Sequence, residues 1–207
     1  MGLLRLLLND PVSFVLLAFP LLYSVIIHEV AHGWVALKMG DQTAKWLGRL
    51  TLDPRKHLDP IGTLMLFVFG FGWAKPVPVN FNNLRDFRKG LIFVSAAGIA
   101  ANVVLAFLSL LALRYFHPSP FGITSTVLTY LAQINILLAS FNLIPIPPLD
   151  GSKILMGFAS RNFQYSLASL EPYGMFIVIG LLYLGVLDPV VAFFRWLIVG
   201  FISLLLP

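Results

Sequence analysis

The chain has 207 residues, of which 58% are hydrophobic and only 11% are charged, and its mean hydropathy is +0.89. An ordinary soluble domain is about 25% charged, so this composition excludes a soluble domain. It indicates an integral membrane protein that has the lipid bilayer as a partner. The net charge of +5 fits the excess of Lys and Arg in cytoplasmic loops and does not indicate a nucleic-acid partner. The chain has no cysteine, which excludes a thiolate nucleophile, a Cys-bound metal and disulfide bonds.

Apolar runs predict the membrane spans, because a spanning helix needs about 17–25 residues. Three runs are long enough to span, at residues 11–37, 91–113 and 123–144. Two late runs, at 173–187 and 190–206, are marginal in length. The run at 61–73 is so short that we expect it to be re-entrant or partly buried. The expected fold class is an all-α polytopic membrane bundle of about five to six transmembrane helices, with a short extended or β segment at the cytoplasmic side.

The first span carries three ionisable side chains, His28, Glu29 and His32, within the stretch SVIIHEVAHGWVA. Such groups are costly inside a bilayer and are therefore candidates for function. On a helix the two histidines lie one turn apart on one face, where they can share a cation, and Zn²⁺ is the usual ion of His-Glu-x-x-His. Glu29 points to the side and suits a general base that acts on zinc-bound water. The alternative is a pair of buried histidines that hydrogen-bond to neighbouring helices.

Two segments follow that span. It should end near Gly40, a suitable C-cap residue, and residues 41–60 then form a polar loop. Further on, AKPVPVNFNN cannot be helical because of its two prolines, and its alternating pattern predicts an extended edge segment. A substrate helix that unwinds in a membrane needs new hydrogen-bond partners, so we hypothesise that residues 72–81 pair with the substrate as a strand. The alternative is an ordinary cytoplasmic loop that caps the bundle.

A catalytic zinc needs three protein ligands and an open position, and without cysteine the third ligand must be His, Asp or Glu. Most of the other acidic and histidine residues fall in loops or at helix ends. Asp150, in FNLIPIPPLDGS, follows a span that ends on the cytoplasmic side, which predicts it at about the depth of His28 and His32. The alternative for Asp150 is a turn residue of an Asp-Gly pair.

Together, HEVAH at 28–32 and NLIPIPPLDG at 142–151 resemble the site-2 proteases, zinc metalloproteases that cut substrates within the membrane. The similarity runs through roughly residues 10–160. It implies that His28, His32 and Asp150 hold one Zn²⁺ per chain and that Glu29 is catalytic. The implied substrate is a transmembrane protein or peptide, cut in or near its span, at an active site that opens toward the cytoplasm. The chain has no PDZ-type insertion or nucleotide-sensing tail and resembles the compact form.

Two asparagines are further candidates. The resemblance implies that Asn142 is catalytic, because it orients substrate or stabilises the developing oxyanion, which a side-chain amide can do. The alternative for Asn142 is an interhelical hydrogen bond. Asn102, in SAAGIAANVVLA, is interpreted as structural, because small residues form a close-packing face there. The family often has Gly-Pro before that segment, whereas here Gly98 is followed by Ile99.

We expect one membrane metalloprotease domain over residues 1–207, with a catalytic bundle at about 10–160, closing helices at about 172–206 and no appended soluble domain. One alternative is a metal-ion transporter, which should show polar residues at several depths, whereas here the strong ligands gather at one depth. A second is a zinc-binding scaffold without activity, which would not need Glu29. A serine protease is disfavoured, because Ser95 lacks the preceding glycine and no later helix offers a partner histidine.

Overall fold

A computed structural model of the chain describes residues 3–70, 72–120 and 122–206. Position 71, inside the predicted segment 61–73, as well as position 121 and the ends at 1–2 and 207, lie outside the described residues. Within these described ranges the secondary structure is helical and holds no sheet, only an isolated β-bridge between Leu58 and Ala74. Five helices are long and apolar enough to cross a membrane. The predicted fold class is confirmed.

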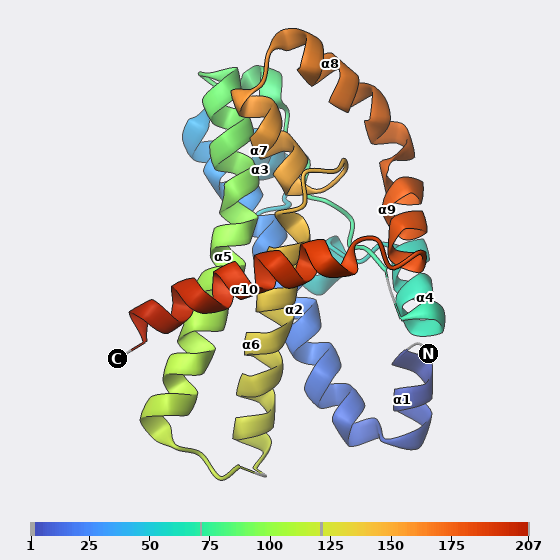
Figure 1. Cartoon of the computed structure of the whole chain (residues 1–207), viewed down its shortest axis with the longest axis vertical. Helices are drawn as coiled ribbons and strands as arrows, with labels where there is room; N and C mark the ends of the chain where they lie inside the picture. Colours follow the sequence, from blue (N-terminus) through green and yellow to red (C-terminus); the bar gives the residue numbers. More distant parts are fainter. Residues whose placement is uncertain (1–2, 71, 121, 207) are drawn as a thin grey trace.

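Three long helices form the centre of the fold and pack against one another (Figure 1). Their hydropathy accounts for the predicted spans. Two of the helices extend beyond the predicted apolar run, and the third ends at a polar residue, two positions before the end of its run. They are α2 (Pro11–Met39), α5 (Phe87–Phe116) and α6 (Ile123–Asn142). A buried hydrogen bond of 2.8 Å from Asn135 Nδ2 to Ser24 Oγ joins α6 to α2.

The two ends of α2 follow from local sequence. Asp10 precedes Pro11, and its side chain accepts the backbone N–H of Ser13, so that it caps the first turn. Gly40 ends the helix in the left-handed region with φ = 116°, as predicted, and a residue with a Cβ would be strained there. The predicted metal-binding motif at 28–32 therefore lies in the last three turns of a helix whose two ends are fixed.

Short elements connect α2 to α5 along the chain. They are α3 (Thr43–Trp46), η1 (Pro54–Lys56), α4 (Pro60–Phe69) and η2 (Phe81–Asn83), and a short α1 (Leu3–Asn9) precedes α2. The α4 helix is the short apolar segment predicted from the sequence, and α1 lies beside it (Figure 1). Between α4 and η2, residues 73–80 are extended, but apart from the single bridge at Ala74 they pair with no strand among the described residues.

The C-terminal part contains α7 (Asp150–Phe158), α8 (Arg161–Leu170), η3 (Glu171–Tyr173), α9 (Gly174–Tyr183) and α10 (Asp188–Leu205). The first predicted closing helix, at 173–187, differs from the structure, where the helical run begins at Arg161 and ends at Tyr183. Its amphipathic first part, α8, lies outside the apolar run that predicted the helix. In Figure 1, α10 runs across α5 and α6 and not alongside them. Ile198 and Ile202 of α10 pack with Ile99 and Ile136 in a buried apolar cluster that joins the three helices.

Candidate metal centre

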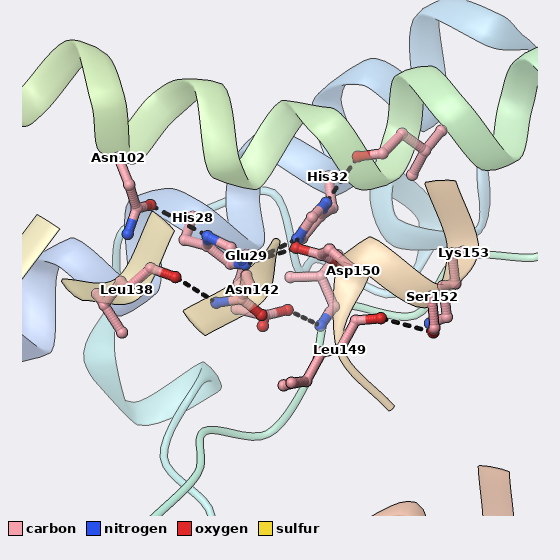
Figure 2. A network of polar contacts seen from close by, with 12 residues as sticks. His28, Glu29, His32, Asn102, Leu138, Asn142, Leu149, Asp150, Ser152 and Lys153 are labelled. Carbon is pink, nitrogen blue, oxygen red and sulfur yellow. Dashed lines mark hydrogen bonds and ion pairs between the residues drawn. The ribbon is translucent and has the colours of Figure 1, made fainter. Parts of the chain in front are cut away.

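Residues of three helices meet at one place. His28, Glu29 and His32 come from α2, Asn142 is the last residue of α6, and Asp150 is the first residue of α7. Figure 2 shows both imidazoles turned toward the carboxylate of Asp150. The predicted ligands are nearly inaccessible to solvent, with exposed fractions of 6% for His28, 8% for His32 and 9% for Asp150.

The ligand atoms of these three residues are close enough to share one ion. His28 Nε2 and His32 Nε2 lie 3.0 Å apart, and each lies 3.2 Å from Asp150 Oδ2. All ligand atoms fall within 4.8 Å of one another, the separation expected of a metal-binding group. Two imidazole nitrogens and a carboxylate oxygen are a usual donor set for catalytic zinc, which keeps a fourth position open.

The outer nitrogens of the two histidines determine where their protons lie. His32 Nδ1 is 2.7 Å from the carbonyl oxygen of Val94, and His28 Nδ1 is 3.0 Å from Asn102 Oδ1. Both acceptors place the proton of a neutral imidazole on Nδ1, so that both Nε2 atoms present lone pairs to each other. Asp150 Oδ2 is buried and accepts no hydrogen bond within the described residues. Three lone-pair donors that converge without a proton between them fit a bound cation.

The α5 helix forms the floor of this centre. Gly98 is required there, because a Cβ at this position would lie 2.5 Å from His32 Nε2 and 2.6 Å from His28 Cε1. The small residues around Gly98 predicted a close-packing helix face, but not which side chains pack on it. Asn102 lies one turn further along α5 and is fully buried, and its Oδ1 contacts Nδ1 of His28, a predicted ligand. The structural interpretation of Asn102 is compatible with this contact.

Glu29 lies beside the two histidines and faces the extended segment. Its Oε2 accepts a hydrogen bond of 2.8 Å from the backbone N–H of Val77. Val77 is one of the residues predicted to pair with a substrate strand, but its amide already has an acceptor in this structure. This contact could not be predicted from the sequence, because no local pattern connects residues 48 positions apart.

A cavity of about 320 Å³ opens next to the centre. Its wall is made by the predicted site residues, by the extended segment and by part of α5, and its polar side chains come from α2, α5, α6 and α7. The residues that line it are His28, Glu29, His32, Pro76, Val77, Pro78, Val79, Phe81, Val94, Ser95, Asn142, Pro148, Asp150 and Lys153. A peptide in extended conformation could therefore contact Glu29, the histidines and Asn142 from one space.

Asn142 lines the cavity with its side chain partly committed to its own helix. Its Nδ2 donates to the carbonyl oxygen of Leu138 at 3.0 Å, as Figure 2 shows. An amide nitrogen has two protons, so this bond leaves one for another acceptor.

His57, which the sequence assigns to a loop, is fully buried and lies outside the centre, where its Nε2 contacts the carbonyl oxygen of Thr51 at 2.8 Å.

Comparisons with known proteins agree with this chemistry. Residues 118–184, which include Asn142 and Asp150, match the model of peptidase family M50. The chain is 40% identical over 168 residues to "Putative zinc metalloprotease YwhC" of Bacillus subtilis, over 78% of this chain and 77% of that protein. It is 32% identical over 174 residues to "Putative zinc metalloprotease Rip2" of Mycolicibacterium smegmatis, over 82% of this chain and 67% of the relative. It is also 27% identical over 159 residues to "Zinc metalloprotease MJ0392" of Methanocaldococcus jannaschii, over 76% of this chain and 38% of the relative. No solved structure matches the chain.

Proposed function

Because the chain belongs to peptidase family M50, the site-2 protease family of zinc metalloproteases, we propose that it hydrolyses peptide bonds in or near the transmembrane segments of membrane proteins. Zinc is the metal of this family, and we assign one ion per chain to His28, His32 and Asp150. The whole chain is assigned to one membrane-embedded domain whose active site opens toward the cytoplasm.

One observation supports this assignment most strongly. Two imidazole Nε2 atoms and a buried carboxylate oxygen converge within 3.2 Å of one another, while both Nδ1 atoms face oxygen acceptors that hold the protons outward. The three ligands also adjoin a cavity that Glu29 and Asn142 line. A metal that served the fold alone would need neither the cavity nor a carboxylate beside it.

Each side chain has a defined task in this proposal. A bound zinc ion supplies Lewis acidity and lowers the pKa of water at the site. Glu29 removes one proton from the attacking water and delivers it to the nitrogen of the leaving amine, so that water is added across the peptide bond. The hydrogen bond from Val77 holds Oε2 of Glu29 and leaves Oε1 for the proton. Asn102 and the Val94 carbonyl oxygen keep both imidazoles in the tautomer that presents Nε2.

The proposed function is tested with the purified chain in detergent and a single-span model peptide. We expect cleavage that stops when a chelator removes zinc and returns when about one equivalent per chain is restored. Mass spectrometry of the products should place the cut in the cytoplasmic half of the substrate span, because the motif lies in the last turns of α2, next to the basic residues that follow it.

Three outcomes would contradict all or part of the proposal. Cleavage by protein shown to contain no metal would exclude a metalloprotease mechanism. A zinc-loaded protein that cuts no tested span but conducts Zn²⁺ into liposomes would favour the transporter. Cuts confined to soluble loops of the substrate would still fit a metalloprotease, but they would exclude cleavage in or near the membrane span.

Asn142 is assigned to the carbonyl oxygen of the scissile bond, through the Nδ2 proton that Leu138 does not use. Loss of one such donor costs about 10²–10³-fold in kcat, so Asn142→Ala should lower kcat by about that factor and leave zinc content unchanged. Asn162→Ala, on the partly exposed α8, is the matched control. An unchanged kcat for Asn142→Ala would assign Asn142 to helix packing alone.

A further inference from the structure

The extended segment that faces Glu29 is held by side chains outside the centre. Residues 75–80, which we call the 75–80 segment, carry prolines at positions 76 and 78 and make no strand pairing among the described residues. One backbone hydrogen bond of 2.8 Å, from the Lys75 N–H to the carbonyl oxygen of His57, holds its first residue, and the rest of its position depends on side-chain contacts. The Val77 amide in this segment is the donor to Glu29, so whatever fixes the segment also fixes the proposed base.

Arg49 contacts the segment from the side opposite Glu29. Its Nη2 donates to the carbonyl oxygens of Lys75 at 2.9 Å and Pro76 at 3.1 Å. Arg49 is only 9% exposed and makes no ion pair within residues 3–70, 72–120 and 122–206. Burying a cation without a carboxylate partner costs free energy, and here hydrogen bonds to two backbone carbonyl oxygens offset part of that cost. The side chain is therefore committed to the 75–80 segment.

The geometry of one peptide unit connects Arg49 to Glu29. The carbonyl oxygen of Pro76 and the amide of Val77 belong to the same planar peptide group, so they point in opposite directions. Arg49 binds the oxygen and Glu29 accepts from the N–H. A guanidinium on the carbonyl oxygen fixes the plane of this group and also polarises it, which strengthens the N–H donor on the other side.

Asp41 holds the other end of the segment. Its Oδ2 accepts the backbone N–H of Asn80 at 2.8 Å, and its Oδ1 accepts Asn83 Nδ2 at 3.0 Å. Burial works against the charged form of Asp41, but hydrogen bonds from Thr43, Asn83 and Asn80 outweigh it and lower the pKa of Asp41. The anchor is thus a carboxylate with charge-assisted bonds. Both Asp41 and Arg49 follow α2 closely in sequence, so one stretch supplies the base and both anchors.

We infer that Arg49 and Asp41 are positioning residues for catalysis: they hold the 75–80 segment so that the Pro76–Val77 peptide group orients the carboxylate of Glu29. This inference rests on the proposed role of Glu29 as general base. Neither residue touches the predicted metal ligands, and the loss of either should leave zinc binding intact. What changes is the orientation of the base and the order of the cavity wall that the segment forms.

The test uses the absence of native cysteine, because a single Cys introduced at the exposed Lys75 takes a spin label without side reactions. In the labelled chain, Arg49→Gln should add a mobile component to the spectrum. In the unlabelled chain it should lower kcat on the order of 10²-fold, the effect of misplacing a catalytic group by about 1 Å, with KM changed much less and zinc content unchanged. Arg49→Lys, which keeps a donor and the charge, should recover part of both losses.

The matched controls come from the same loop. Asp53 and Arg55 form an ion pair at 2.9 Å in which Arg55 is 88% exposed, and neither contacts the 75–80 segment. Arg55→Gln and Asp53→Asn should leave kcat and label mobility as in the parent chain. Asp41→Asn should mobilise the label and lower kcat in the same way as Arg49→Gln, and it remains a test if Arg49→Gln does not fold.

The outcomes separate this inference from the proposed function. If Arg49→Gln and Asp41→Asn leave label mobility and kcat unchanged, or if they lower zinc content and thermal stability together, the positioning role is wrong. Label mobility and zinc content need no substrate, so they test the anchors even if the wild-type chain cleaves no peptide. In that case the proposed function fails, while an increase in mobility would still assign Arg49 and Asp41 to the segment.

Discussion

Replacing Glu29 with glutamine should lower kcat for cleavage of a single-span substrate by about 10²–10⁴-fold, the usual contribution of a general base. Glutamine has the same shape and can still accept the Val77 N–H that Glu29 Oε2 accepts at 2.8 Å, but it cannot take a proton from water. The variant should therefore keep about one zinc per chain and the cavity around it. The measurement is kcat and KM with the same peptide, with zinc content determined on the same samples.

The chain offers a close control for this variant, because Glu171 is its only other glutamate. Glu171 lies 3.8 Å from Lys153 Nζ and is about half exposed. Glu171→Gln should cleave like the wild type. If Glu29→Gln retained near-normal kcat, Glu29 would not be the base, and another group would have to accept the proton of the attacking water. If Glu29→Gln lost its zinc, the carboxylate would have to be counted among the groups that support the metal.

The parts of the fold that depend on local sequence could be predicted well. The long apolar runs matched α2, α5 and α6, and Gly40 ends α2 as its sequence position indicated. The family and its zinc are confirmed by the relatives, whereas the assignment of individual ligands remains a prediction that geometry supports. These successes share a cause: hydropathy, caps and motif spacing act within a few residues.

The features that the sequence did not reveal depend on contacts between distant segments. Gly98 must lack a side chain because of two imidazoles on another helix, and the Val77 amide meets a carboxylate 48 positions earlier. Arg49 and His57 belong to the predicted polar loop at 41–60, yet both are buried. The 75–80 segment contacts the Arg49 side chain and the backbone carbonyl oxygen of His57. Polarity predicts exposure on average, but it does not identify the residues whose partners come from elsewhere in the chain.

The C-terminal helices illustrate a second limit. Hydropathy identified an apolar run at 173–187 but could not show that helix continues back to Arg161, because α8 is amphipathic. Nor could it show that α10 crosses the bundle, since length and composition contain no information about direction. The crossing lets α10 pack on α5 and α6 through Ile198 and Ile202, so the part that was expected to close the bundle also completes its core.

The largest effect on metal binding is expected from Asp150→Asn. Loss of an outer partner of a metal ligand typically costs about 10–100-fold in metal affinity, so loss of an anionic ligand should cost at least about 10²-fold. Asparagine fits the same space but brings a neutral oxygen to the two Nε2 atoms, which lie 3.2 Å from Asp150 Oδ2. Cleavage should fall with zinc content, and added zinc should restore part of it.

Thermal unfolding with and without zinc provides a readout that needs no substrate. At a free zinc concentration of 100 times Kd, binding stabilises the folded state by about 2.7 kcal/mol, and a 10²-fold weaker site reduces this to about 0.4 kcal/mol. Asp188→Asn is the control, because Asp188 is the first residue of α10 just as Asp150 is of α7. Both variants lose an acidic group at a helix N-terminus, so a difference in their zinc response cannot come from the helix dipole.

Asp150→Asn and Glu29→Gln together separate binding from chemistry at one centre. The first should lose zinc and cleavage, and the second should keep zinc and lose cleavage. If Asp150→Asn bound zinc with unchanged affinity, Asp150 would not be a ligand, and the convergence of its carboxylate on His28 and His32 would need another explanation. If both variants kept zinc and neither lowered cleavage, the catalytic assignment of the whole cavity would be wrong, because no third carboxylate lines it among the residues that the structure describes.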